Sequence, residues 1–121
     1  MNLPRFFSRT AWALLAATGV QGAAMAQQPD FPARSVKLVV ANGAGSAPDL
    51  LARQVGNVVG KEWKQAVVVE NKGAAGGVSA VDAVVKAQPD GYTLLVGGDS
   101  AITIMPNVQR NLPYDVKNDL V

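Results

Sequence analysis

Residues 36–60 read VKLVVANGAGSAPDLLARQVGNVVG, and this stretch decides the fold class. Its first five residues are almost all apolar, which is typical of a parallel β-strand buried on both faces. The loop at residues 41–46 is rich in glycine and other small residues, and it predicts a sharp end to the strand. Apolar residues then recur at helical spacing. The stretch therefore predicts a strand, a tight loop and a helix.

The predicted helix has a recognisable start and end. Ser46 is a favourable N-cap residue, Asp49 follows three positions later, and Pro48 is tolerated in the first turn. Gly60 or Lys61 is the expected last residue, because the helical pattern of apolar residues stops there.

The same alternation of elements continues along the chain. We expect strands at residues 66–70 and 92–96, a helix at 78–87, and glycine-rich loops at 71–77 and 97–100. A third helix begins near Ala101 and should be short, because it meets Pro106. Since crossover connections are right-handed, the order β-α-β-α-β predicts an α/β fold with a parallel sheet in strand order 2-1-3.

The first 26 residues have the parts of a secretory signal peptide. Arg5 and Arg9 precede an apolar run at residues 11–20, and Ala24-Met25-Ala26 is the small-residue pattern that signal peptidase cleaves after. The run is too short to span a bilayer as a helix. The alternative is a buried N-terminal helix. We predict a signal peptide at 1–26, a mature chain at 27–121 and a periplasmic location.

The composition excludes several classes of function. The absence of cysteine excludes disulfides, thiolate metal sites and a lipid anchor, and the absence of histidine excludes a Ser-His-Asp triad. Eleven Lys and Arg less two in the predicted signal peptide leave nine, which nine Asp and Glu balance. A mature chain of zero net charge is not expected to bind nucleic acid. We expect neither a cofactor nor a metal ion.

The placement of glycine points to a binding site. Of twelve glycines, seven lie at the three predicted strand-to-helix junctions. All three junctions fall on the carboxyl edge of a parallel sheet, where ligands bind in open α/β folds. Glycine lets the main chain approach a ligand, and helix N-termini present unpaired N–H donors. The edge therefore favours a carboxylate, phosphate or sulfate over a cation.

Two other interpretations of these loops stay open. The glycines could serve tight turns alone. A dinucleotide site would fit Gly43-x-Gly45 followed by Glu70 at the end of the second strand. However, Pro48 occupies the position of the third glycine, and Glu70 could instead act as a cap or pair with Lys72.

Asp49 also has two interpretations. It could complete a capping box with Ser46, or it could face the ligand; capping is favoured, because a carboxylate would repel an anion. An exported enzyme would have to use Ser46, Asp49, Asp99 or Ser100, and no spacing among them indicates a catalytic base. The aromatic residues Trp63, Tyr92 and Tyr114 are expected to pack rather than to stack on a ligand.

Four motifs carry a family resemblance. They are VKLVVANGAGSAPDLLAR at residues 36–53, VVVENKGAAGG at 67–77, PDGYTLLVG at 89–97, and IMPN and LPYD at 104–115. In this order they resemble the strands and loops of the tripartite tricarboxylate transporter substrate-binding proteins, also called the Bug family. The resemblance covers essentially all of the mature chain.

The resemblance implies a two-lobed periplasmic receptor that is a monomer when full length. Such a receptor captures a small organic anion, a carboxylate, and delivers it to a membrane permease made of a large and a small subunit. Family members hold a ligand carboxylate with the loop after the first strand, and the loop after the third strand lies nearby. Carried onto this chain, the ligand-binding residues are Asn42, Gly43, Gly45, Ser46, Ala47, Asp49, Gly98, Asp99 and Ser100.

The chain departs from the family pattern in its loops and its length. Gly43-Ala44-Gly45-Ser46 stands where the family has more proline and two adjacent glycines, and Gly73-Ala74 replaces a Pro-Gly pair. Family members are more than twice as long. We therefore expect residues 27–121 to be a partial N-terminal lobe of a truncated receptor, with the second lobe absent. The alternatives are a non-functional remnant fragment and an exported enzyme lobe.

Overall fold

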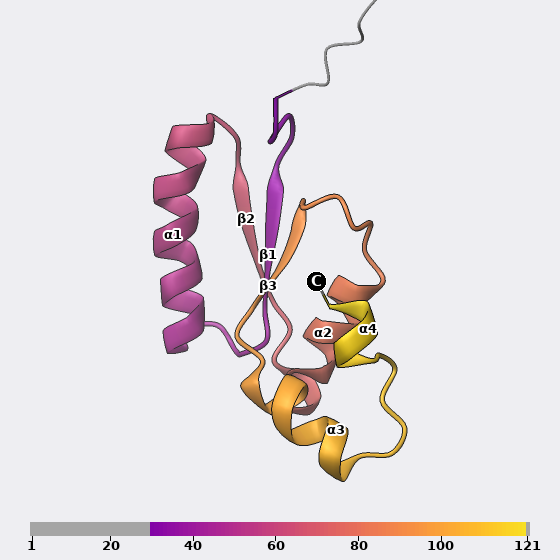
Figure 1. Cartoon of the computed structure of the whole chain (residues 1–121). Coiled ribbons are helices and arrows are strands. Elements are labelled where there is room, and N and C mark those ends of the chain that lie inside the picture. Colours follow the sequence, from indigo (N-terminus) through magenta and orange to yellow (C-terminus); the bar gives the residue numbers. More distant parts are fainter. Residues whose placement is uncertain (1–29, 121) are drawn as a thin grey trace, which may run out of the picture.

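The computed structural model describes residues 30–120 of the chain (Figure 1). The predicted signal peptide at 1–26 lies outside the described residues. Between residues 30 and 120, no helix has both the length and the apolar character needed to cross a membrane.

Three parallel strands form the sheet at the centre of the fold. They are β1 (Val36–Val40), β2 (Val67–Asn71) and β3 (Thr93–Val96), in the order β2-β1-β3. Val40 is opposite Asn71 on one side and Val96 on the other, so the three strands end at the same level. The predicted α/β fold and strand order are confirmed, and the loops that follow the strands start from one edge of the sheet.

Each face of the sheet is covered by one crossover helix. Helix α1 (Ala47–Trp63) packs Ala52 against Leu38 and Val40. Helix α2 (Val78–Val85) packs Ala80 against Val39 and Ala41 on the other face. Figure 1 shows the two helices on opposite sides of the strands. The alternation of side chains along β1 therefore supplies both halves of the core, as its nearly continuous apolar sequence predicts.

The chain after β3 folds back onto α2. Tyr114 is buried with Val81 and Ala101, and its hydroxyl donates a hydrogen bond to the carbonyl oxygen of Ala101 at 2.8 Å. Burial raises the pKa of the Tyr114 phenol. This contact holds the last segment beside α2 in Figure 1. The short helical elements of the chain are η1 (Ala74–Gly77), η2 (Ser100–Ile104), α3 (Met105–Val108) and α4 (Val116–Asp119).

The prediction that α1 ends at Gly60 or Lys61 is wrong, because the helix continues to Trp63. A Cβ on Gly56 would lie 3.1 Å from a methyl of Val67, and one on Gly60 would lie 3.0 Å from the carbonyl oxygen of Gln65. These glycines therefore let the helix approach β2 rather than end it. The residue that ends the helix is Lys64, which adopts a left-handed φ of 54°.

Of the other predicted boundaries, those of the strand at 36–40, the start of α2 at 78 and the end of β3 at 96 match the structure, and the remaining ones differ by one or two residues. Strand β2 ends at Asn71 rather than at residue 70, β3 begins at Thr93, and α2 ends at Val85. The predicted short helix near Ala101 is present as η2, a π-helical segment that runs directly into α3. The predicted packing roles of Trp63 and Tyr92 are confirmed, because both rings contact Phe31 edge to face.

Candidate site at the carboxyl edge of the sheet

The three loops that leave the strands surround one hollow at the carboxyl edge of the sheet. The hollow has a volume of about 390 Å³ and is open to solvent. We call it the loop hollow. Its lining residues come from the loops after β1, β2 and β3 and from the first turn of α1: Ala41, Asn42, Gly43, Pro48, Gly73, Gly76, Gly97, Gly98, Asp99 and Ser100.

Main-chain contact between the first two loops depends on Gly73. A Cβ at this position would lie 2.8 Å from the main-chain nitrogen of Gly43 and 2.9 Å from the carbonyl carbon of Asn42. The third loop approaches the side chain of Asn42, because a Cβ on Gly97 would lie 3.0 Å from Asn42 Oδ1. The absence of side chains at these positions is therefore what brings the loops together around the hollow.

The lining of the loop hollow is poor in charge. Within the described part of the chain, its lining includes the carboxylate of Asp99 but no lysine or arginine. Any attraction for an anion must therefore come from main-chain N–H groups and from the N-terminal end of α1 at Pro48, rather than from cationic side chains.

The structure brings five of the nine predicted site residues to the loop hollow. These are Asn42, Gly43, Gly98, Asp99 and Ser100. The other four, Gly45, Ser46, Ala47 and Asp49, lie in the same loop and the start of α1 but are outside the lining. The N–H of Gly45 donates to Asp49 Oδ2 at 2.8 Å and that of Ser46 to the Gly43 carbonyl at 3.3 Å, so both groups are already engaged. Whether any of the nine residues contacts a ligand stays a prediction.

The favoured prediction of a capping box between Ser46 and Asp49 is wrong. The side chain of Ser46 makes no cap hydrogen bond, and its Oγ is buried without a partner. Asp49 accepts a hydrogen bond from the N–H of Gly45, one residue before the N-cap. Because Gly45 has a left-handed φ of 80°, the loop turns one residue earlier than the capping-box pattern requires. Asp49 does not line the loop hollow, and the alternative that it faces a ligand stays a prediction.

Asp49 is instead buried in a network of hydrogen bonds. Its relative exposure is 2%, and its carboxylate accepts from Arg53 Nε at 3.0 Å and from Asn71 Nδ2 at 2.9 Å, besides Gly45. The hydrogen bonds from Arg53, followed by those from Gly45 and Asn71, lower the pKa of Asp49 from 3.8 to about 2. The carboxylate is therefore ionised and fully engaged by donors at neutral pH.

Glu70 is also engaged by nearby side chains. Its carboxylate pairs with Lys72 at 2.9 Å and with Lys37 at 3.0 Å, and these hydrogen bonds lower the pKa of Glu70. The predicted pairing with Lys72 is thus present. In a dinucleotide site, the carboxylate of Glu70 would have to be free to hydrogen-bond a ribose hydroxyl. Its ion pairs with Lys37 and Lys72 therefore disfavour the dinucleotide interpretation.

Five lining residues are absent from the predicted site, namely Ala41, Pro48, Gly73, Gly76 and Gly97. The three glycines belong to the junction pattern in the sequence, and that pattern is the signal that could have placed them in the site. Ala41 and Pro48 carry no polar side chain, so only the geometry of the loops reveals their position.

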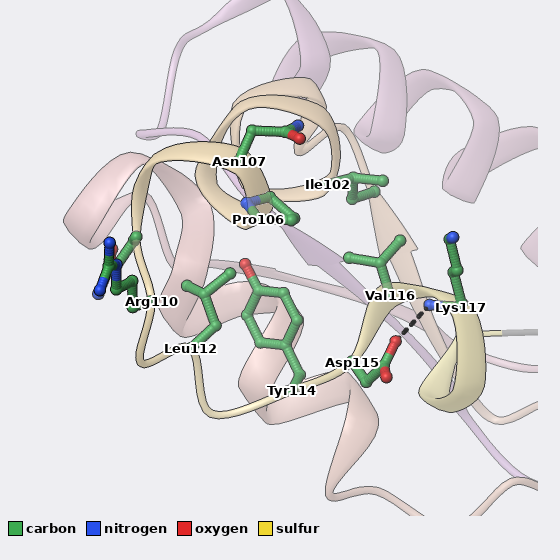
Figure 2. Close-up of a pocket in the computed structure, with 10 residues that line it drawn as sticks. Ile102, Pro106, Asn107, Arg110, Leu112, Tyr114, Asp115, Val116 and Lys117 are labelled. Carbon is green, nitrogen blue, oxygen red and sulfur yellow. Dashed lines mark hydrogen bonds between the residues drawn. The ribbon is translucent and has the colours of Figure 1, made fainter.

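A second hollow, of about 430 Å³, lies between α3 and α4 (Figure 2). Asp115 in its lining caps α4, because its Oδ1 accepts from the N–H of Lys117 at 2.9 Å and its own N–H donates to Asp119 at 2.7 Å. These bonds lower the pKa of Asp115. Arg110 and Lys117 lie at opposite ends of the hollow in Figure 2. Charges so far apart do not converge on one anion.

The fold and the converging loops define the class of protein. Parallel β-α-β-α-β units with ligand loops at the carboxyl edge occur in periplasmic binding proteins, and solved proteins of that class are similar to this chain. The R. palustris protein Rpa4515, solved with adipate, is 32% identical with a TM-score of 0.68 over 73% of this chain and 29% of its own. The periplasmic binding protein BugD is 38% identical with a TM-score of 0.62 over 71% of this chain and 28% of its own.

The family follows from the sequence comparison. Residues 51–121 match the family described as "Tripartite tricarboxylate transporter family receptor", and the chain belongs to this family. A UPF0065 protein of Bordetella bronchiseptica is 45% identical over 95 residues, which are 78% of this chain and 28% of the relative. The predicted family resemblance is therefore confirmed, and the chain spans less than a third of the length of each of these three relatives.

Proposed function

We propose that this chain is the opening part of a periplasmic receptor that binds a small carboxylate for a tripartite tricarboxylate-type transporter. The observation that carries the proposal is the loop hollow, where three glycine-rich loops meet at the carboxyl edge of the sheet. In this account the signal peptide at 1–26 directs export, and residues 27–121 form part of the N-terminal lobe. The permease subunits of the transporter are the proposed partners.

The chemistry of the loop hollow favours a carboxylate recognised by main-chain groups. Its lining exposes the main chain of several glycines, and it lies at the start of α1, where the helix dipole attracts a negative charge although the lining residue Pro48 has no N–H to donate. The relative Rpa4515 was solved with adipate, a dicarboxylate that is consistent with this chemistry. The site residues that we propose to contact the carboxylate are Asn42, Gly43, Gly98, Asp99 and Ser100.

We propose binding without catalysis. Two of the four candidate residues for an enzyme, Ser46 and Asp49, lie outside the lining of the loop hollow: Ser46 Oγ is buried without a partner, and the Asp49 carboxylate is held by three donor residues. A nucleophile needs an adjacent base, and a base needs a free pair of electrons near the substrate. Neither residue meets these requirements in this geometry.

Calorimetric titration tests the proposed function. Adipate, citrate and benzoate would each be titrated into the purified chain, with hexane-1,6-diol as the uncharged counterpart of adipate. We expect at least one of the acids to bind and the diol not to bind, because main-chain N–H groups recognise the carboxylate. Binding of none of the three acids, or equal binding of the diol, would contradict the proposal.

A Gly43→Ala variant localises the binding. Gly43 lines the hollow, and a Cβ built on it has no atom within 4 Å, so a methyl group fits the folded chain without a clash. The methyl would occupy space next to the ligand and weaken binding by about tenfold. Full affinity in Gly43→Ala would place the ligand outside the loop hollow.

A further inference from the structure

Asp49 connects three elements that border the loop hollow, although it does not line the hollow itself. Its carboxylate holds the N–H of Gly45 in the first loop, the guanidinium of Arg53 on α1 and the amide of Asn71 at the end of β2. The distance between Asp49 Oδ1 and Arg53 Nη2 is 3.0 Å. One buried side chain therefore fixes the first loop relative to a helix and a strand.

Asn71 extends this connection to the lining residues. Its Nδ2 donates to the carbonyl oxygen of Asn42 at 3.3 Å as well as to Asp49, and its Oδ1 accepts from Arg53 Nη2 at 3.1 Å. The main chain of Gly43 thus lies between two anchored points, the carbonyl group of its neighbour Asn42 and the Gly45 N–H. Asn42 and Gly43, together with Ala41, are the residues of the first loop that line the hollow.

The network requires a carboxylate at position 49. Asp49 accepts hydrogen bonds at both oxygens from three donor residues, and none of these N–H groups can act as an acceptor. An asparagine would offer one acceptor oxygen and turn an NH₂ group toward a donor. The positive charge of Arg53 also balances the negative charge of Asp49. The buried acid therefore adds little repulsion toward an anion in the hollow.

We propose that Asp49 is a positioning residue for the anion site, with Arg53 and Asn71 as its partners. It holds the main chain of Asn42 and Gly43 in the arrangement that accepts a carboxylate. This inference rests on the proposed function and adds a role for a residue that does not touch the ligand. It also explains why an acid near an anion site is buried rather than exposed.

Hydrogen exchange of individual main-chain amides, followed by NMR, tests the inference in the purified chain. In Asp49→Asn we expect exchange at Gly45 to accelerate about tenfold, because the charge-assisted hydrogen bond from its N–H to the carboxylate is lost. Exchange at Val39 and Val40 in the sheet should stay unchanged. Affinity for whichever acid of the adipate, citrate and benzoate panel binds the unmodified chain should fall about tenfold.

Matched variants separate positioning from general stability. Asp82→Asn removes the acid of another i,i+4 pair, with Lys86 on α2, and should leave both loop exchange and affinity unchanged. If Asp49→Asn does not fold, Arg53→Gln tests the effect on affinity, since Arg53 is about half exposed and its removal leaves Gly45 and Asn71 on the carboxylate. Arg53→Lys keeps the charge and should recover part of the affinity that Arg53→Gln loses.

The outcomes distinguish this inference from the proposed function. Unchanged exchange at Gly45 in Asp49→Asn would overturn the positioning role, as would full affinity in Arg53→Gln where Asp49→Asn does not fold. Faster exchange with full affinity would also overturn it, while the proposed function would stand. If the unmodified chain binds no acid in the panel, the proposed function fails first, and the positioning role fails with it.

Discussion

Gly73 shows how a single missing side chain shapes the candidate site. Its φ is −80°, a value open to any residue, so the glycine is not needed for its own conformation. It is needed because the main chain of the first loop passes where a Cβ would be. Position 73 therefore acts through steric contact between two loops.

A Gly73→Ala substitution should destabilise the chain by about 1–3 kcal/mol, the usual range for overpacking at a site that cannot relax. The clash is with main-chain atoms of Asn42 and Gly43, and these cannot move without shifting the loop. Urea unfolding measures the change. Gly43→Ala is the control, since its methyl meets no atom within 4 Å. Equal stability of the two variants would contradict the proposed contact.

The lowered pKa of Asp49 predicts a dependence of stability on pH. Because the pKa is lower in the folded chain than its usual value of 3.8, the ionised carboxylate stabilises the fold above pH 4. That contribution is lost as the pH falls through about 2. The charged group that faces Asp49 is Arg53, which stays protonated throughout this range.

The difference in thermal unfolding temperature between the unmodified chain and Asp49→Asn should therefore be largest between pH 4 and pH 7 and should shrink toward pH 2. Circular dichroism melts at several pH values measure it. Comparing the two chains cancels the parallel contributions of Glu70 and Asp115, whose pKa values are also lowered. A difference that grows as the pH falls would show that Asp49 has no such role.

At the scale of elements, hydrophobic patterning predicted the strands and helices, but it did not reveal what each glycine does. Gly60 carries the same local signal as a helix end, yet it packs beside Gln65 and Val67 while the helix continues to Trp63. The distinction depends on contacts with β2 that local sequence does not contain. The same reason explains Asp49, whose partner Asn71 is 22 residues away.

The end of α1 provides a test at this scale. Lys64 adopts φ 54° and ψ 29°, a left-handed conformation that is unfavourable for a residue with a Cβ. Lys64→Gly should therefore stabilise the chain by about 0.5–1 kcal/mol. Lys61→Gly, inside the same helix, should destabilise it by about 1 kcal/mol. Urea unfolding would count against the assigned helix end if both variants were destabilised.

For the whole molecule, the sequence motifs identified the family and the edge of the sheet on which the site lies. They did not separate the residues of the first loop that face the hollow, Asn42 and Gly43, from the residues that support it, Gly45 and Asp49. That separation arises from the left-handed turn at Gly45 and the contact with β2. Residue type alone could not supply it.

The export prediction belongs to the whole chain. When the gene is expressed in a bacterium with a periplasm, we expect the protein in the periplasmic fraction with Gln27 as its first residue, because Ala24-Met25-Ala26 is the pattern that signal peptidase recognises. Intact-mass spectrometry of that fraction measures the N-terminus. A mass that includes residues 1–26 would contradict the signal peptide.

An NMR titration with adipate, citrate and benzoate in turn tests the central claim most directly, namely that the loops at the three strand ends together hold a carboxylate. Amide signals would be followed along the whole chain, with hexane-1,6-diol as control. We predict the largest shifts at Asn42, Gly43, Gly98, Asp99 and Ser100, and none with the diol. No shifts at these amides with any of the three acids, or shifts of the same size at the opposite end of the sheet near Arg34, would contradict the account.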